Sequence, residues 1–194
     1  MLKIHTLTLG LFQVNCYIVH PENSDRCAVI DPGYDEKKIL QYLQEKGLQP
    51  EAILLTHGHF DHVGAMKALA MELDCPVYVR PEEHTMPHAL TAGPLGDTLA
   101  YPDRFSVAGM DISVLHTPGH TPGSVCLLIE DAMFSGDTLF QLSCGRTDFP
   151  ESDPAAMGPS LQKLAALEGN YHVLPGHNAF SELDYERANN PFMR

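Results

Sequence analysis

The chain has 194 residues, 44% of them hydrophobic, and a formal net charge of -13 at pH 7. A chain of this length can bury a core without disulfides or partner chains, and we expect one domain over residues 1–194. The charge argues against a nucleic-acid surface, because lysines and arginines that neutralise phosphates supply most of that affinity. An anionic membrane surface is disfavoured for the same reason.

The cysteines predict a reducing compartment. There are five, an odd number, and they form no CxxC pair, which is typical of free thiols in a cytosol. Residues 1–19 are fairly apolar but lack the basic start and the cleavage site of an export signal, and no stretch has the apolar length of a membrane span. We expect a cytoplasmic protein without membrane contacts. The oligomeric state stays open.

The first half of the chain alternates strand and helix patterns. Predicted strands span residues 2–9, 15–20, 26–30, 51–55 and 76–79. Residues 35–47 predict an amphipathic helix with Ile39, Leu40 and Leu43 on one face and Gly47 at its end. A second helix is predicted over residues 61–73.

The second half repeats this style after a long Pro- and Gly-rich loop over residues 80–103. Predicted strands follow near residues 110–115, 124–129, 132–135 and 171–174. A polar loop reaches to about residue 152. Helices are predicted over residues 153–169 and near residues 181–188.

The loop "THGHFDH", residues 56–62, holds three histidines and an aspartate. Neutral imidazoles and a carboxylate are good ligands for a metal such as zinc. In extended backbone, His57 and His59 project to the same side and can reach one ion. A helix that begins near Phe60 would carry Asp61 and His62 to a second position. We expect Gly58 to supply unusual backbone dihedrals there.

Three more candidate ligands each follow a predicted strand: His120 in "SVLHTPGHTPG", Asp137 in "AMFSGDT" and His177 in "HVLPGHN". Loops that leave one edge of a sheet point the same way. We therefore predict two ions with an open position at each, as catalytic zinc requires. One ion would take His57, His59 and His120, the other Asp61, His62 and His177, and Asp137 would bridge both.

The motifs "THGHFDH", "PGHTPGS", "SGDTLF" and "LPGH" resemble, in sequence and in order, the motifs of the metallo-β-lactamase-fold hydrolases. The resemblance implies a four-layer αβ/βα sandwich of two similar halves, with the dinuclear site at one edge of the sheets. The segments "NCY", "IDPG", "GRTDFPESD" and "ERANNPF" are most similar to the short bacterial glyoxalase II-like proteins. In that group Asp31 supports the metal loop from outside the ligand set; a turn residue before Pro32 is the alternative.

The resemblance implies a metal-dependent hydrolase of acyl-thioesters such as S-lactoylglutathione, a small-molecule substrate. Two divalent ions, with zinc expected and iron or manganese as alternatives, would hold a bridging hydroxide as the nucleophile. Asp61 is the catalytic candidate that orients the hydroxide and takes its proton. Full-length glyoxalase II proteins carry an extra helical domain that helps to bind glutathione, whereas only residues 178–194 follow His177 here. The thiol and the acyl group therefore stay open.

Several further residues have two interpretations. Arg146 in "CGRTD" is placed to meet a substrate carboxylate, or it forms a pair with Asp148 that only fixes the loop. Cys144 could also touch the site, but a buried or idle thiol is favoured. His84 and His88, four apart, could form another metal site if helical, but loop positions at a pocket mouth are favoured. The remaining histidines are expected to be plain strand residues: His5, His20, His116 and His172.

Two other functions remain as alternatives. The segment "CGRTDF" also resembles persulfide dioxygenases, which would hold one iron through His57, His120 and Asp137. Asp61, His62 and His177 would then lie outside the ligand set. A metal-bound interaction module without enzymatic activity is the second alternative. A β-lactamase is disfavoured because we see no export signal.

Overall fold

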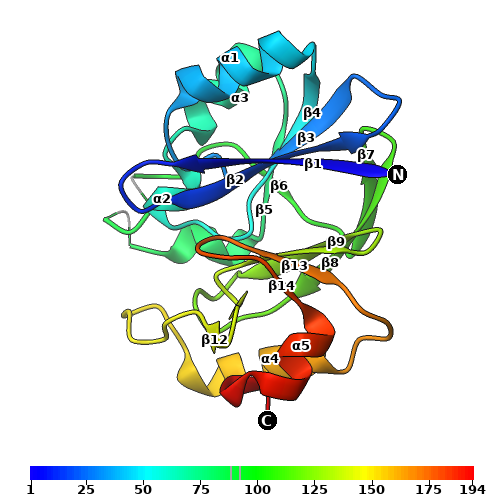
Figure 1. Cartoon of the computed structure of the whole chain (residues 1–194). Coiled ribbons are helices and arrows are strands. Elements are labelled where there is room, and N and C mark those ends of the chain that lie inside the picture. The colour runs from blue at the N-terminus through cyan, green and yellow to red at the C-terminus, as the bar shows by residue number, and fades with distance from the viewer. Residues whose placement is uncertain (88, 92) are drawn as a thin grey trace.

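Two six-stranded sheets form the centre of the molecule (Figure 1). They are seen in a computed structural model that describes residues 1–87, 89–91 and 93–194. In the first sheet the strands follow chain order; β1 to β3 pair antiparallel, and β3 to β6 pair parallel. Its strands are β1 (Leu2–Leu9), β2 (Val14–Pro21), β3 (Arg26–Ile30), β4 (Gln49–Leu54), β5 (Val77–Val79) and β6 (Leu99–Ala100).

The second sheet has the order β14-β13-β10-β9-β8-β7. Its β10–β13 pair is parallel and the others are antiparallel. Its strands are β7 (Arg104–Val107), β8 (Met110–His116), β9 (Val125–Ile129), β10 (Ala132–Gly136), β13 (His172–Pro175) and β14 (Ser181–Glu182). A small hairpin of β11 (Leu139–Phe140) and β12 (Ser143–Cys144) follows β10.

Helices cover the outer face of each sheet (Figure 1). Helices α1 and α3 pack on the first sheet, and α4 and α5 pack on the second. The order of layers is helix, sheet, sheet, helix, which confirms the predicted four-layer αβ/βα sandwich. The helices are α1 (Glu36–Lys46), α2 (Phe60–Val63), α3 (Met66–Leu73), α4 (Pro154–Ala165) and α5 (Leu183–Asn189), with 3-10 turns η1 (Pro81–Thr85) and η2 (Pro191–Met193).

Strand β3 shows why the inner strands are continuous apolar runs. Cys27 and Val29 belong to the apolar layer under α1 and α3, whereas Ala28 and Ile30 face the second sheet. After the exposed Arg26, both faces of the strand are therefore buried, which explains its apolar run. Strands held on both sides are rigid supports for the loops that leave their ends.

The predicted helix over residues 35–47 is confirmed as α1. Ile39 and Leu43 are buried on its inner face. Gly47 ends the helix with φ 66°, in the left-handed region that favours glycine. Helix α4 begins as its sequence predicts, because the Asp153 carboxylate accepts a hydrogen bond from the Ala155 backbone N–H at 2.8 Å.

The helix predicted over residues 61–73 is wrong in one respect, because it is divided into α2 and α3. The backbone N–H of Ala65 donates to the carbonyl of Pro32 at 3.0 Å. Gly64 lies so close to this turn that a Cβ there would be 2.2 Å from the Gly33 carbonyl oxygen. The helix is interrupted where the turn after β3 passes against it.

The loop predicted over residues 80–103 contains η1 and β6, and the polar loop before residue 152 contains β11 and β12. Strand β7 was not predicted. These pieces are short and lie at sheet edges or over loops, where hydrophobic alternation is weak. In the part of the chain that the structure describes, no helix combines the length and apolar character needed to cross a bilayer.

Candidate metal centre

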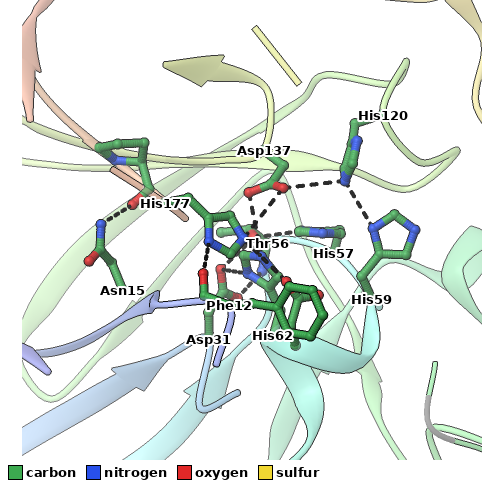
Figure 2. Close-up of polar contacts among 12 residues, drawn as sticks. Phe12, Asn15, Asp31, Thr56, His57, His59, His62, His120, Asp137 and His177 are labelled. Atoms are coloured by element: carbon green, nitrogen blue, oxygen red, sulfur yellow. Dashed lines mark hydrogen bonds and ion pairs between the residues drawn. The ribbon is translucent and has the colours of Figure 1, made fainter. Parts of the chain in front are cut away.

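Loops that follow five strands meet at one end of the two sheets (Figure 2). Each loop carries polar side chains that point toward a common centre. The strands β3, β4, β8, β10 and β13 deliver, in that order, Asp31, the histidines of residues 57–62, His120, Asp137 and His177. The recurrence of strand and polar loop in the sequence therefore corresponds to one place in space.

The first group of side chains joins the loop after β4 to the loop after β8. One donor atom each of His57, His59 and His120 lies within 4.8 Å of the others. Nδ1 of His59 is 2.9 Å from Nε2 of His120. All three side chains are buried. The structure brings together the three histidines that the sequence assigned to one ion.

The second group joins α2 to the loop after β13. Donor atoms of Asp61, His62 and His177 lie within 4.8 Å of one another. Nε2 of His177 is 3.2 Å from Nε2 of His62 and 3.2 Å from Oδ2 of Asp61. This is the set that the sequence assigned to a second ion.

Asp137 lies between the two groups. Its Oδ2 atom is 3.4 Å from Nε2 of His120 and 3.7 Å from Nε2 of His177. Its Oδ1 atom is 3.4 Å from Nε2 of His62. One carboxylate therefore faces both groups, which is the position that a bridging ligand requires.

Each of the five imidazoles has one nitrogen turned inward and the other held from outside. The outer contacts are His57 Nδ1 to Thr56 Oγ1 at 3.1 Å, His59 Nε2 to Glu151 Oε1 at 2.7 Å, His62 Nδ1 to Asp31 Oδ2 at 2.9 Å, His120 Nδ1 to the Arg146 carbonyl at 2.8 Å, and His177 Nδ1 to the Phe12 carbonyl at 3.0 Å. An N–H that donates outward leaves a lone pair on the inner nitrogen. Histidines that bind metals in proteins have this arrangement.

Asp31 supports the cluster from below. It is buried, with φ 49°, and its Oδ1 accepts the Thr56 backbone N–H at 2.8 Å. Its Oδ2 accepts the Thr56 hydroxyl at 2.6 Å as well as His62 Nδ1–H. One donor atom each of Asp31, His57 and His62 also lies within 4.8 Å of the other two. Because Asp31 meets the outer nitrogen of His62, its geometry suits support better than ligation.

Burial and mutual charge shape the protonation of the metal-free cluster. Burial and the neighbouring imidazoles, His62 first, lower the pKa of His57 well below its usual value. For His62 burial acts downward, but the charges of Asp137 and Asp31 outweigh it and raise the pKa well above its usual value. Burial would raise the pKa of Asp137, yet His62 above all holds it far below the usual range.

Two buried atoms in the cluster indicate what the site can hold. Within the described residues, His57 Nε2 and Asp137 Oδ1 have no hydrogen-bond partner. An unsatisfied buried polar atom costs about 1–3 kcal/mol, and a cation would satisfy both atoms. Imidazole and carboxylate donors suit zinc, iron or manganese. The residues present therefore fit divalent metal ions.

A cavity of about 360 Å³ opens above the cluster. Its floor is formed by His59, Asp61, His120, Asp137 and His177. Its walls are largely apolar and are formed by Phe12, Phe60, Leu90 and Phe149, with Arg146 and Asn178 at the polar parts. Apolar walls around a few polar groups are typical of small-molecule sites.

Arg146 lies at this cavity with its guanidinium 4.2 Å from the centre of the Phe149 ring. It also donates twice to Asp148, with Nε to Oδ1 at 2.6 Å and Nη2 to Oδ2 at 2.7 Å. Both side chains are exposed, at 59% and 67%. The geometry thus contains both the loop-fixing pair and a cation beside the cavity.

Three contributors were missed in the sequence: Glu151, Glu83 and the apolar wall. Glu151 holds His59, and Phe12 extends into the cavity from the turn between β1 and β2. Glu151 lies in the segment "GRTDFPESD" that carries the family resemblance, but nothing in the segment marks it as a partner of His59. An aromatic residue in a turn, such as Phe12, carries no distinguishing pattern.

The unusual backbone dihedrals expected at Gly58 are not found, because its φ does not lie in the left-handed region. Glycine is needed there for space: a Cβ would lie 2.9 Å from Met86 Cε and 3.0 Å from Glu83 Oε2.

The other described histidines and Cys144 lie outside the cluster. His84 is in η1, where its Nε2 is 2.8 Å from the Thr98 hydroxyl. His88 lies outside the described residues, so the His84–His88 site stays untested. Cys144 is half-buried in β12, and burial raises the pKa of its thiol. As predicted, strands contain His5, His20, His116 and His172.

Comparison with known proteins supports this picture. Residues 9–177 match the model of the metallo-β-lactamase superfamily. The hydroxyacylglutathione hydrolase GloC of Haemophilus influenzae is 31% identical over 99% of this chain and 98% of its own length. The predicted membership of the metallo-β-lactamase superfamily is confirmed.

Solved structures agree. The BLEG-1 B3 metallo-β-lactamase has a TM-score of 0.89 at 34% identity, covering 100% of this chain and 99% of its own. TTHA1623 in a di-iron-bound form has a TM-score of 0.86 at 38% identity, covering 97% and 99%. ETHE1 from Myxococcus xanthus has a TM-score of 0.81 at 25% identity, covering 97% and 83%. The sandwich fold, the loop motifs and these similarities show that the chain belongs to the metallo-β-lactamase superfamily, with a site of histidines and aspartates suited to metal ions.

Proposed function

We propose that this protein is a dinuclear metal-dependent hydrolase of acyl-thioesters, such as S-lactoylglutathione. The observation that carries the proposal is the position of Asp137, whose carboxylate faces His120 on one side and His62 and His177 on the other. The proposed unit is the single domain of residues 1–194. GloC, which is matched over nearly its whole length, is named a hydroxyacylglutathione hydrolase, so a short chain is compatible with this substrate class.

The proposed ligands of the first ion are His57 Nε2, His59 Nδ1 and His120 Nε2. Those of the second are Asp61, His62 Nε2 and His177 Nε2, with Asp137 shared. Zinc is proposed because it suits this donor set. Iron is the close alternative, since TTHA1623 was solved with two irons, and manganese is the third. When bound, such ions supply a nucleophile at neutral pH and polarise a carbonyl.

Asp61 is the proposed catalytic residue. It lies at the cavity floor with a side chain 14% exposed, and its Oδ2 is held 3.2 Å from His177 Nε2. Burial would raise its pKa, but the hydrogen bond with His177 and the charge of His62 lower it overall. Asp61 is therefore ionised at neutral pH. Its carboxylate orients the attacking water and accepts the proton that the water loses.

The cavity walls fit an acyl-thioester. Phe12, Phe60 and Phe149 line the cavity with apolar surface against which an acyl chain can pack. A thiolate leaves without a strong general acid, so the two acidic residues that line the cavity, Asp61 and Asp137, need not protonate the leaving group. Arg146 is proposed to meet a carboxylate of the substrate at the rim.

Mononuclear-iron persulfide dioxygenase is the second candidate. The Asp137 carboxylate, His120 and His57 can form the facial set of two histidines and one carboxylate that such iron sites use. Iron content discriminates, because this reaction needs one iron per chain and the hydrolase needs two ions.

The proposal is tested by elemental analysis of the purified protein together with hydrolysis of S-lactoylglutathione, followed by thiol release. We expect two ions per chain and thiol release that a chelator abolishes and added zinc restores. One iron per chain with oxygen uptake on glutathione persulfide would instead support the dioxygenase. A metal-loaded protein that is inert toward thioesters, esters, β-lactams and persulfides would support a non-enzymatic interaction module.

The proposed compartment is the cytoplasm. Cys16, Cys27 and Cys126 are buried free thiols, and Cys75 and Cys144 are half-buried free thiols. Free cysteines of this kind are typical of proteins kept in a reducing environment.

A further inference from the structure

Glu83 is a buried carboxylate that lies next to the cluster without belonging to it. It comes from η1, and its side chain is 0% exposed. Its Oε2 accepts the backbone N–H of Gly58 at 2.6 Å, and its Oε1 accepts the backbone N–H of Gly123 at 2.6 Å. Both oxygens are thus used, each by a different loop.

These two loops are the ones that deliver the first group of histidines. Gly58 stands between His57 and His59, and Gly123 lies in the turn that contains His120. Glu83 is separated from Gly58 by 25 residues and from Gly123 by 40. A single side chain therefore joins two segments that are distant in sequence.

The contact is close on both sides. A Cβ added at Gly123 would lie 2.7 Å from Glu83 Oε1, and one added at Gly58 would lie 3.0 Å from Oε2. The carboxylate occupies the space that the two glycines leave. The two loops that it joins carry His59 and His120, whose Nδ1 and Nε2 atoms lie 2.9 Å apart.

We propose that Glu83 is a positioning residue that sets the geometry of the first metal site by holding the loop of His57 and His59 against the loop of His120. This inference rests on the proposed metal centre. The carboxylate is needed because each oxygen accepts an N–H. Glutamine has nearly the same shape but can accept at one end only, and its amide N–H₂ would face a second donor.

The second site gives an internal reference. Among the described residues, Asp61, His62 and His177 make no hydrogen bond with Glu83, whose two oxygens accept from Gly58 and Gly123. Loss of the Glu83 carboxylate should therefore weaken the binding of the first ion and leave the affinity for the second ion unchanged. If Glu83 only stabilised the fold, its loss would weaken the binding of both ions or of neither.

Glu186 offers a matched control. Its side chain is also 0% exposed, and its Oε2 accepts the Leu142 backbone N–H and the Asn190 side-chain N–H, both at 2.8 Å. It belongs to α5 and holds the hairpin after β10. The substitution Glu186→Gln makes the same chemical change at a buried carboxylate that touches neither histidine loop.

The experiment is a cobalt(II) titration of the metal-free wild type, Glu83→Gln and Glu186→Gln in the presence of a competing chelator, read from the cobalt absorption bands. In Glu83→Gln we expect one of two ions to bind about 10–100-fold more weakly, the range seen when an outer partner of a metal ligand is lost. The other ion should bind as in wild type. Glu186→Gln should bind both ions as wild type does.

A second variant covers the case in which Glu83→Gln does not fold. Glu83→Asp keeps the charge but is one methylene shorter, so it can reach only one loop, and the same selective weakening is expected. Wild-type affinity for both ions in either folded variant, or equal loss at both sites, would overturn the inference. If the wild type itself does not bind two ions, the proposed metal centre fails instead, and the two failures are distinguished.

Discussion

His62 donates from Nδ1 to Oδ2 of Asp31 over 2.9 Å, while its Nε2 faces His177 at 3.2 Å. In the neutral imidazole, Asp31 thus fixes which ring nitrogen carries the proton and which one offers a lone pair to the centre of the cluster. Asp31 has φ 49°, a conformation that few residue types adopt readily, asparagine and aspartate among them. This relationship gives the first prediction.

Asp31→Asn should lower the affinity of the second ion about 10–100-fold. Asparagine tolerates the backbone conformation, but its amide N–H₂ would face His62 Nδ1 and favour the tautomer with the proton on Nε2. That proton would occupy the ligand position. Isothermal titration of the metal-free protein with zinc measures the change.

Asp35→Asn is the matched control, because Asp35 also has a positive φ, 56°, and lies at the start of α1 rather than at the cluster. It should bind zinc as wild type does. If both variants bind alike, Asp31 does not orient His62.

Asp137→Ala should lose both ions and lower turnover by well over about 100-fold, more than the loss of an outer partner costs. The reason is that its carboxylate faces histidines of both groups. Metal content after gel filtration and thioester turnover are the measurements. Turnover at the wild-type level would exclude the bridging role.

Metal binding should release protons near neutral pH. Burial alone would lower the pKa of His62, but Asp137 and Asp31 raise it well above its usual value, so the metal-free ring takes up a proton more readily than a free imidazole does. An ion can bind Nε2 only after that proton has left, so affinity should rise with pH. Calorimetry of metal binding in buffers of different ionisation enthalpy gives the number of protons released. A binding heat that does not depend on the buffer would contradict proton release.

Arg146→Ala should raise KM for an anionic thioester about 10-fold and leave kcat within about 2-fold. Loss of an interaction made equally with substrate and transition state changes KM alone. Arg146 lies at the cavity rim, away from the floor where Asp61 acts. An uncharged thioester is the control substrate, and its KM should stay unchanged. Equal changes for both substrates would favour a pair with Asp148 that only fixes the loop.

Much of the fold could be predicted because its signals are local. The helix α1 has its apolar face and Gly47 at its end, and the apolar runs of β3 and β4 mark strands buried on both faces. The break between α2 and α3 could not be predicted. It depends on Pro32 and Gly33 passing against Gly64, a contact that helix periodicity does not encode.

The candidate site divides in the same way. The seven residues proposed as ligands are histidines and aspartates in the loops that follow strands or, for Asp61 and His62, in the short helix α2, so their residue type and place in the pattern single them out. Glu83 and Glu151 are glutamates in polar loops, and only the tertiary structure gives them their partners. Phe12, in a turn and 56% exposed, reads as a surface residue until the cavity is seen.

The most direct test of the dinuclear centre is anomalous diffraction from crystals of the metal-loaded protein at the absorption edge of the bound metal. Two peaks are expected, one among His57, His59 and His120 and one among Asp61, His62 and His177, with Asp137 beside both. A single peak held by His57, His120 and Asp137, or no peak at these side chains, would contradict the account.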